Sequence, residues 1–191
     1  MKSLLVLLTL AIGPAAIADT TTLNFDEFGT SFPIDAASVR GLGVTFLFSG
    51  GTALYNYSLG GGTVLVSDPA LAGPTSGALT LDFAFPTQIL SFDIAMESAD
   101  PISNAYTVTW GGNSFSGDTA PLDFFSEGYY SYAGSTSITS ALITFDSNSA
   151  PGFALDNLTF ETETPEPGTT ALIGAVLVAL GAATKRRRYA L

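Results

Sequence analysis

The segment TLDFAFPTQILSFDIAM, residues 80–96, alternates apolar and polar residues more clearly than any other part of the chain. In an extended strand, successive side chains point to opposite faces of the sheet. Leu81, Phe83 and Phe85 therefore fall on one face, with Asp82 and Ala84 on the other. This two-residue period predicts a β-strand with one face in the protein core.

The second half of this segment requires an interruption of the pattern. We expect Pro86 and Thr87 to form a turn between two strands, because proline fixes φ and cannot donate to a sheet ladder. Beyond the turn, Ile89 and Phe92 share a face only if the alternation slips by one residue at Leu90. The slip predicts a β-bulge at that position.

Short runs of the same kind recur through residues 20–164. They are rich in β-branched and aromatic residues, and no stretch keeps a helical period for three turns. These features predict an all-β, antiparallel β-sandwich, jelly-roll-like, over residues 19–163. The predicted strands lie within residues 21–28, 44–50, 52–59, 62–68, 78–85, 88–97, 105–112, 124–134, 137–147 and 153–163.

The charges of the 191-residue chain are unevenly distributed. All 17 acidic residues lie between Asp19 and Glu166, where Arg40 is the single base, and the other basic residues lie at the two ends. A domain with this surplus of negative charge repels nucleic acid and anionic lipid, so we expect no nucleic-acid partner. It is compatible with cations and with neutral polar ligands such as sugars.

The sequence contains no cysteine and no histidine. This excludes disulfides, thiol nucleophiles and cysteine-ligated zinc, and it removes the commonest general base. No pair of carboxylates and no activated serine marks a catalytic centre. We therefore expect a protein that is not an enzyme.

The first 18 residues have the organisation of a secretory signal peptide. Lys2 precedes an apolar stretch over residues 4–12, and residues 16–18 (AIA) place small side chains where signal peptidase cuts. We expect cleavage between Ala18 and Asp19 and export of the remainder of the chain.

Residues 164–191 have three parts. Pro165, Glu166 and Pro167 are expected to be extended, since each proline disfavours helix in the residue before it. Residues 168–184 carry no charge, and as a helix rising ~1.5 Å per residue they are just long enough to span a thin bilayer as a single C-terminal transmembrane helix. By the positive-inside rule the basic cluster that follows stays in the cytoplasm; it consists of Lys185, Arg186, Arg187 and Arg188.

The tripeptide, the uncharged helix and the basic cluster together resemble the PEP-CTERM sorting signal, found on exported proteins of Gram-negative bacteria that produce exopolysaccharide. In that family the membrane protease-transpeptidase exosortase recognises the Pro-Glu-Pro tripeptide and removes the helix. The resemblance implies exosortase and signal peptidase as partners. It also implies an inner-membrane anchor before processing and a cell-surface or extracellular location afterwards.

The central domain resembles the β-sandwich domains found upstream of such tails. It opens with NFDEF (residues 24–28), continues with GVTF (43–46) and closes with GFALDNLTF (152–160). Domains of this kind share their general plan with carbohydrate-binding jelly rolls. The resemblance implies a fold rather than a ligand.

Oxygen-bearing side chains near the two ends of the domain suggest a calcium site. Asp26 and Glu27 lie on the first predicted strand, Asp156 and Asn157 lie on the last, and the terminal strands of a sandwich are commonly neighbours. Calcium takes about six to eight oxygen ligands of these kinds. Alternatively, Asp156 and Asn157 bond to local backbone while the first pair is solvated.

Aromatic residues suggest a sugar-binding surface, because a ring covers the apolar face of a pyranose while acids and amides bond its hydroxyls. Trp110 ends its predicted strand and is expected to expose its ring. Tyr130 and Tyr132 share a strand face, with Tyr129 opposite. The alternative is that these rings belong to the core.

From these features we expect an exported, non-enzymatic envelope or extracellular-matrix protein, sorted by exosortase and associated with exopolysaccharide. Three alternatives stay open. They are a carbohydrate-binding module with a defined glycan, a polysaccharide hydrolase, and a surface protein whose tail is never removed.

Overall fold

The computed structural model describes residues 18–26, 33–34, 42–50, 54–57 and 63–163. Residues 19–162 form a compact unit of their own. The predicted signal peptide, the sorting tripeptide, the transmembrane helix over residues 168–184 and the basic tail lie outside the described residues. Among the residues that are described, no helix is long and apolar enough to cross a membrane.

The described residues contain ten β-strands and no α-helix. The strands are β1 (Ala18–Leu23), β2 (Pro33–Ile34), β3 (Val44–Phe48), β4 (Leu54–Tyr57), β5 (Ala70–Pro74), β6 (Ala78–Met96), β7 (Ile102–Trp110), β8 (Asn113–Leu122), β9 (Phe125–Phe145) and β10 (Gly152–Glu163).

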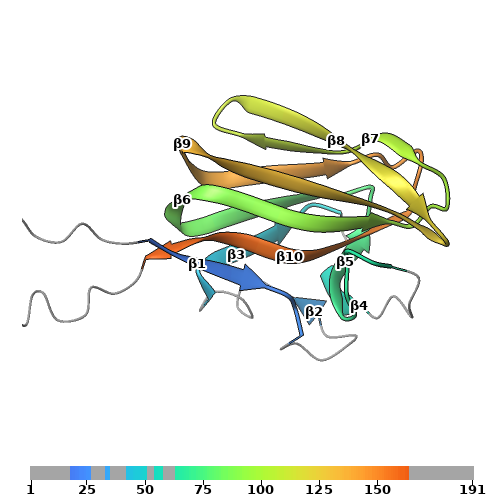
Figure 1. Cartoon of the computed structure of the whole chain (residues 1–191), viewed down its shortest axis with the longest axis horizontal. Helices are drawn as coiled ribbons and strands as arrows, with labels where there is room; N and C mark the ends of the chain where they lie inside the picture. The colour runs from blue at the N-terminus through green and yellow to red at the C-terminus, as the bar shows by residue number, and fades with distance from the viewer. Residues whose placement is uncertain (1–17, 27–32, 35–41, 51–53, 58–62, 164–191) are drawn as a thin grey trace, which may run out of the picture. The chain divides into compact units, whose positions relative to one another are not determined.

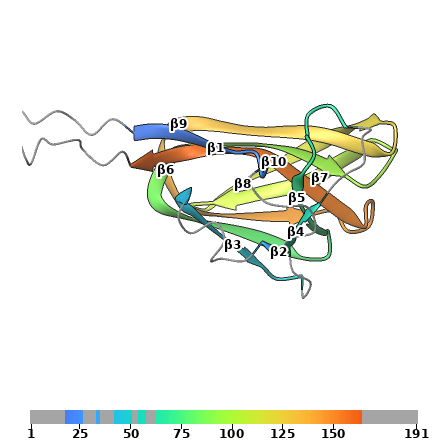
Figure 2. The ribbon, with the colours of Figure 1, turned by 90° about the horizontal axis from the view of Figure 1, so that it is seen from below.

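Two long strands organise the domain. β6 has 19 residues and β9 has 21, whereas a typical strand has about five or six. They pair with each other antiparallel along their length, with the early half of each opposite the late half of the other. Figures 1 and 2 show them side by side, with β6 curving round at one end of the domain.

Because β6 and β9 bend, each contributes to two layers. In the first sheet, the late half of β6 lies between β10 and the early half of β9, and β10 also pairs with β1 and β5. In the second sheet, the early half of β6 lies between β3 and the late half of β9. On the other side of this half of β9 lies β7, which in turn pairs with β8. The predicted all-β, antiparallel, sandwich-like fold is confirmed, while the finer jelly-roll description stays a prediction.

The predicted turn at Pro86 and Thr87 is wrong, since β6 runs through both residues. Proline is tolerated there because the ladder with β9 is interrupted between Asp82 and Thr87. The register shifts again between Thr87 and Ile89, but Leu90 pairs regularly with Tyr132, so the predicted position of the bulge is wrong. Because of this shift Leu90, rather than Ile89, enters the core.

Thr87 fixes this bend from inside the protein. Its side chain is buried, and its Oγ1 donates to the carbonyl of Ile89 at 2.6 Å. The same oxygen accepts a hydrogen bond from the backbone N–H of Glu161 on β10 at 2.8 Å. Thr87, which the sequence predicts to be a turn residue, therefore lies within one long strand, where its hydroxyl bonds to β6 and β10 at the bend.

Other strand predictions also change. Residues 124–134 and 137–147 were expected to be two strands and form the single strand β9. Residues 63–69 form a loop rather than part of a strand over residues 62–68. The strands β5 and β8 were not expected; β5 is short and contains glycine and proline, and β8 is Ser-rich and largely exposed, so neither shows a clear apolar alternation.

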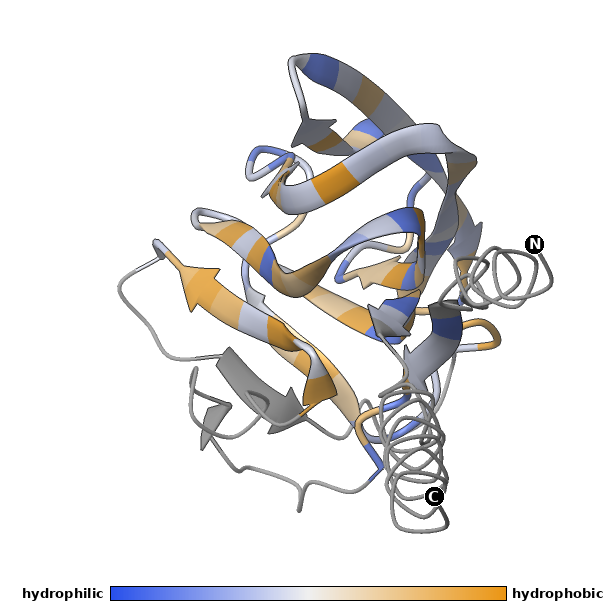
Figure 3. Ribbon diagram, turned by 90° about the vertical axis from the view of Figure 1, so that its left-hand side faces the viewer, coloured by the Kyte–Doolittle hydropathy of each residue, from blue (hydrophilic) through white to orange (hydrophobic). Residues whose placement is uncertain are grey.

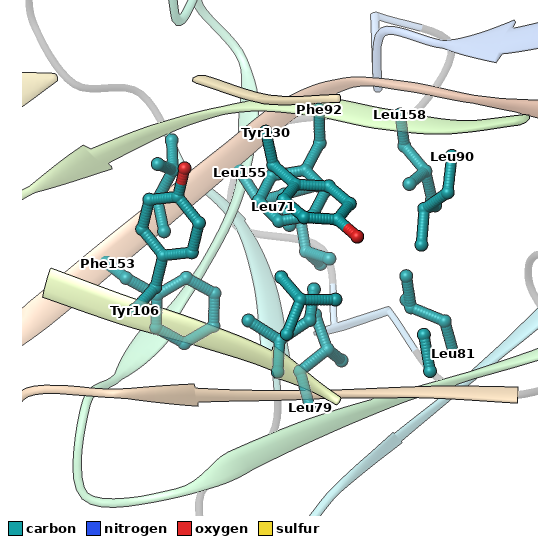
Figure 4. Close-up of a cluster of buried hydrophobic side chains, with 14 of the residues drawn as sticks. Leu71, Leu79, Leu81, Leu90, Phe92, Tyr106, Tyr130, Phe153, Leu155 and Leu158 are labelled. Atoms are coloured by element: carbon teal, nitrogen blue, oxygen red, sulfur yellow. The ribbon is translucent and has the colours of Figure 1, made fainter. Parts of the chain in front are cut away.

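The core lies between the two sheets. Figure 4 shows Leu79 and Leu81 of the second sheet reaching towards Leu90, Phe92 and Leu158 of the first. The alternating hydrophobic and hydrophilic bands along the strands in Figure 3 reflect the same inward and outward alternation. Side chains of both layers are fully buried, so the sandwich has one continuous apolar interior.

The first and last strands are neighbours, as the sequence predicted. β1 pairs with β10, and the Oγ1 atoms of Thr21 and Thr162 lie 3.1 Å apart. The two ends of the described domain therefore leave it side by side (Figure 1). Asp26, which follows β1, lies close enough to β10 for its charge to act on Asp156.

Candidate functional site

The structure brings the three predicted glycan-binding aromatics together. The Trp110 indole Nε1–H donates to the Tyr130 hydroxyl at 3.0 Å, and the centroids of the Trp110 and Tyr132 rings lie 4.4 Å apart. However, Trp110 is only 4% exposed and Tyr130 only 8%. The expectation that Trp110 exposes its ring is wrong, because the end of β7 is covered by Phe115 of β8, which stacks on the indole.

A buried carboxylate holds the loop over residues 63–69. Glu127 on β9 is 7% exposed and accepts hydrogen bonds from three consecutive backbone N–H groups, those of Val64, Leu65 and Val66, at 2.9–3.2 Å. Three donors in succession aimed at one carboxylate form an anion-binding nest that the protein fills with its own side chain. The loop is thereby fixed over the outer side of the first sheet.

Asp156 on β10 binds the next backbone N–H group of the same loop, that of Ser67. It is completely buried, and its Oδ2 accepts hydrogen bonds from the backbone N–H of Ser67 at 2.8 Å and from the Ser67 hydroxyl at 2.6 Å. Its Oδ1 accepts the backbone N–H of Asn157 at 2.7 Å. Asp156 thus bonds to local backbone at Asn157, as in the alternative to a calcium site, but it also bonds to Ser67, 89 residues away in the sequence. The Asn157 side chain donates to Asp93 rather than to its own local backbone.

The predicted calcium ligands are only partly placed together. Asp26 lies close enough for its charge to act on Asp156, but it bonds to Asn24, two residues earlier in the chain, and Glu27 is outside the described residues. Among the residues that the structure describes, no group of three acidic side chains is arranged to hold a metal ion. Three N–H and O–H donors already face the oxygens of Asp156, and they would repel a cation. Calcium binding stays a prediction.

Asp93 on β6 is the third acid of this region. It lies directly opposite Asp156 on β10 and opposite Tyr129 on β9. Its Oδ2 accepts a hydrogen bond from the Asn157 side-chain amide at 2.8 Å, whereas its Oδ1 receives none from the described residues. Burial raises the pKa of Asp93, and the charges of Asp156 and Glu127 add to the rise, against the effect of the Asn157 bond.

The pKa of Asp156 is also raised, again mainly by burial, although Ser67 and Asn157 oppose the shift. A carboxyl whose pKa is higher in the folded than in the unfolded state favours folding below the unfolded value, near 3.9. That contribution is lost as the pH rises through the folded pKa. We therefore expect the melting temperature of the domain to rise as the pH falls from neutral to about 4.

A circular dichroism melting series across this pH range checks this expectation. Asp93→Asn should flatten the pH dependence, whereas Asp100→Asn, which removes an exposed acid from the β6–β7 loop, should leave it unchanged. Below pH 4 the lowered pKa of Asp146, due mainly to its bond with Ser149, acts in the opposite direction. A melting temperature that falls steadily from pH 7 to 4 would contradict the expectation.

The outward side of the first sheet carries two adjacent rows of polar side chains. One row is built of hydroxyls: the Oγ1 atoms of Thr22 and Thr159 lie 2.8 Å apart, and Thr159, Ser91 and Ser131 pair across β10, β6 and β9. The other row contains Asn157, Asp93 and Tyr129. We call this surface the Tyr129 face; it consists of Thr22, Ser91, Asp93, Tyr129, Ser131, Asn157 and Thr159.

Tyr129 projects from this face into solvent. Its side chain is 58% exposed, while its neighbour Tyr130 points into the core and stacks on Phe92 with ring centroids 5.2 Å apart. The backbone of Tyr129 is held from the other side, because the Tyr106 hydroxyl donates to its carbonyl at 2.8 Å. Burial, Tyr130 and Asp118 raise the pKa of Tyr106 to about 12, so this donor keeps its proton.

The outward side of the second sheet offers a useful contrast. It also carries paired hydroxyls, with Thr107 next to Ser116 and Thr109 next to Ser114. The described aromatic side chains on β7, such as Tyr106 and Trp110, instead point inwards and are buried. Of the two hydroxyl-rich faces, the one with Tyr129 combines an exposed ring, a partly buried carboxylate and an amide.

Sequence reasoning placed Tyr129 opposite Tyr130 but did not choose it as a ligand-binding residue. The choice depended on which set of alternate residues in β9 faces the core. Around residues 126–132 both sets contain an aromatic ring, so the sequence does not show which one is buried. The nearby apolar Ala133 and the polar Ser131 did not decide between them. Only the pairing of Tyr130 with the core residue Phe92 shows that Tyr129 points outwards.

Comparisons with known proteins give remote likenesses. No protein-family model matches the chain, and no curated protein matches it. A family 29 carbohydrate-binding module is 16% identical, over 77% of this chain and 90% of that one, with a TM-score of 0.43. The CBM22-1 xylan-binding domain of Paenibacillus barcinonensis Xyn10C is 13% identical, over 78% of this chain and 99% of that one, with a TM-score of 0.42.

A CBM29-2 variant in complex with mannohexaose is 14% identical, over 80% of this chain and 98% of that one, with a TM-score of 0.39. At such values the likeness says nothing about what this chain binds.

Proposed function

We propose that this protein is an exported, non-enzymatic β-sandwich that binds polysaccharide on the Tyr129 face. The observation that carries the proposal is the exposed ring of Tyr129 beside the carboxylate of Asp93, the amide of Asn157 and a row of hydroxyls. A ring of this kind covers the apolar face of a sugar, and the polar groups around it bond to hydroxyls.

The chemistry of this face suits binding better than catalysis. Glycoside hydrolysis needs two carboxyl groups on opposite sides of a bond, with one of them free to protonate the leaving oxygen. Asp156 and Glu127 both accept hydrogen bonds from backbone N–H groups of the loop over residues 63–69. Of the three acids Asp93, Glu127 and Asp156, Asp93 alone has a carboxylate oxygen that accepts no hydrogen bond from the described residues. Release of reducing ends from a host polysaccharide would overturn the non-enzymatic part of the proposal.

Replacing Tyr129 by alanine should reduce affinity for the bound glycan about tenfold or more, because the stacking surface is lost. Screening the domain on an array of neutral, amino-bearing and acidic oligosaccharides identifies the probe, and titration calorimetry measures the affinity. The melting temperature should change little, since the side chain is largely in solvent.

Phe124→Ala is the matched control, because Phe124 is an 80% exposed ring in the β8–β9 turn, outside the Tyr129 face. It should bind like the unchanged protein. The proposal is contradicted if no oligosaccharide binds, or if Tyr129→Ala binds as tightly as the control.

We also propose that the protein reaches the cell surface or matrix by the exosortase route. The support is the order of sequence elements: a signal peptide ending at Ala18, the Pro165-Glu166-Pro167 tripeptide, an uncharged helix and a basic end. The mature protein should begin at Asp19 and end near the tripeptide. Intact mass measurement of protein from the native host tests this, and finding Tyr189-Ala190-Leu191 on most molecules would contradict it.

A further inference from the structure

The charge of the Tyr129 face narrows the class of polysaccharide that it fits. The described residues contain no lysine, arginine or histidine, so no positive side chain among them balances Asp93, Glu127 and Asp156. Asp26 adds to the negative charge acting on Asp156. A glycan rich in uronic acid or sulfate would therefore be repelled by this region.

Asp93 is the acid of this face that can meet a ligand. It is half-buried between Tyr129 and Asp156, and its Oδ1 receives no hydrogen bond from the described residues. A half-buried carboxylate forms a stronger hydrogen bond to a charged donor than to a neutral one. Burial raises the pKa of Asp93, and the negative charges of Asp156 and Glu127 add to the rise.

We infer that the polysaccharide bound on the Tyr129 face carries free amino groups, with a sugar ring on Tyr129 and a protonated amine near Asp93. The sheet supplies the spacing for this arrangement, because directly opposed side chains on neighbouring strands have Cβ atoms only about 5 Å apart. Asp93 and Tyr129 are such a pair. The inference rests on the proposed glycan binding and adds the charge of the ligand.

The test compares three probes by titration calorimetry at neutral pH: a β-1,4-linked glucosamine hexasaccharide, its fully N-acetylated counterpart, and an oligosaccharide of glucuronic acid. We expect the amino probe to bind about tenfold more tightly than the N-acetylated one, which is the size of a charge-assisted hydrogen bond in a half-buried site. The acidic probe should not bind.

Two variants separate a specific contact from general attraction between a polycation and an acidic protein. Asp93→Asn should lose the preference for the amino probe, while Asp100→Asn, which removes the same charge from an exposed loop, should keep it. Equal losses in the two variants would overturn the inference, because the attraction would then be non-specific.

The outcomes also distinguish the inference from the proposed function. If the amino and N-acetylated probes bind equally and Tyr129→Ala weakens both, the face binds glycan but the inference is wrong. If none of the three probes binds and the oligosaccharide array is also silent, the proposed function fails together with the inference.

Discussion

Replacing Trp110 by alanine is expected to lower the free energy of unfolding by about 3–5 kcal/mol, the range found when large aromatic side chains are removed from protein cores. The indole packs on Tyr132 and Phe115 and donates to the Tyr130 hydroxyl, which would lose its partner in the variant. Against a total stability of about 5–15 kcal/mol, this loss leaves the fold marginal. Urea unfolding followed by circular dichroism measures it.

Tyr130→Phe and Phe115→Ala separate the contributions. The first removes only the hydroxyl that accepts from Trp110 and should cost about 1 kcal/mol. The second removes a ring that is already 43% exposed and should cost less than the loss of the indole. A Trp110→Ala variant that unfolds like the parent would show that the ring is not part of the core.

The burial of Trp110 also changes how ligand binding can be followed. It is the single tryptophan of the chain, so tryptophan emission, excited selectively against the seven tyrosines, reports on its surroundings alone. An indole that is 4% exposed should be poorly quenched by a soluble quencher, and a glycan on the Tyr129 face should not alter its emission. Fluorescence therefore suits unfolding experiments here, whereas binding needs calorimetry.

The sequence predicted the fold class because local alternation and global burial agree along most of β6 and β9. Leu79, Leu81 and Ile143 occupy the inward parity that their strands require. Prediction was wrong where one strand serves two sheets. A two-residue period shows that Pro86 and Thr87 break the alternation, but not whether the chain reverses or merely bends there.

The candidate site was harder to predict for a related reason. Aromatic rings occur on both parities of β9, so composition alone could not separate the core Tyr130 from the exposed Tyr129. The acidic residues presented the same difficulty. Asp156 looks like a surface ligand in the sequence, yet its oxygens are bonded to a loop almost ninety residues away, and only the folded structure brings the two together.

Replacing Glu127 by alanine is expected to lower the free energy of unfolding by about 3 kcal/mol and to loosen the loop over residues 63–69. Its carboxylate accepts from three backbone N–H groups, of which that of Val66 is fully buried. A buried donor left without a partner costs about 1–3 kcal/mol. Release of the buried carboxylate into the unfolded state offsets part of this sum, since its own burial is unfavourable.

Glu97→Ala is the matched control, because Glu97 is an exposed acid directly after β6 and its replacement should change stability by less than about 0.5 kcal/mol. Glu127→Gln should cost less than alanine, because its amide oxygen can still accept from part of the loop while its NH2 group faces the remaining N–H donors. Hydrogen exchange gives a local measure: the N–H groups of Val64, Leu65 and Val66 should lose protection in Glu127→Ala, lose part of it in Glu127→Gln and keep it in Glu97→Ala. If those amides stay protected without the carboxylate, the loop is held instead by the packing of Val66 against Ala70, Ala95 and Ala154. In that case Glu127 does not stabilise the loop, and its burial lowers the stability of the folded protein.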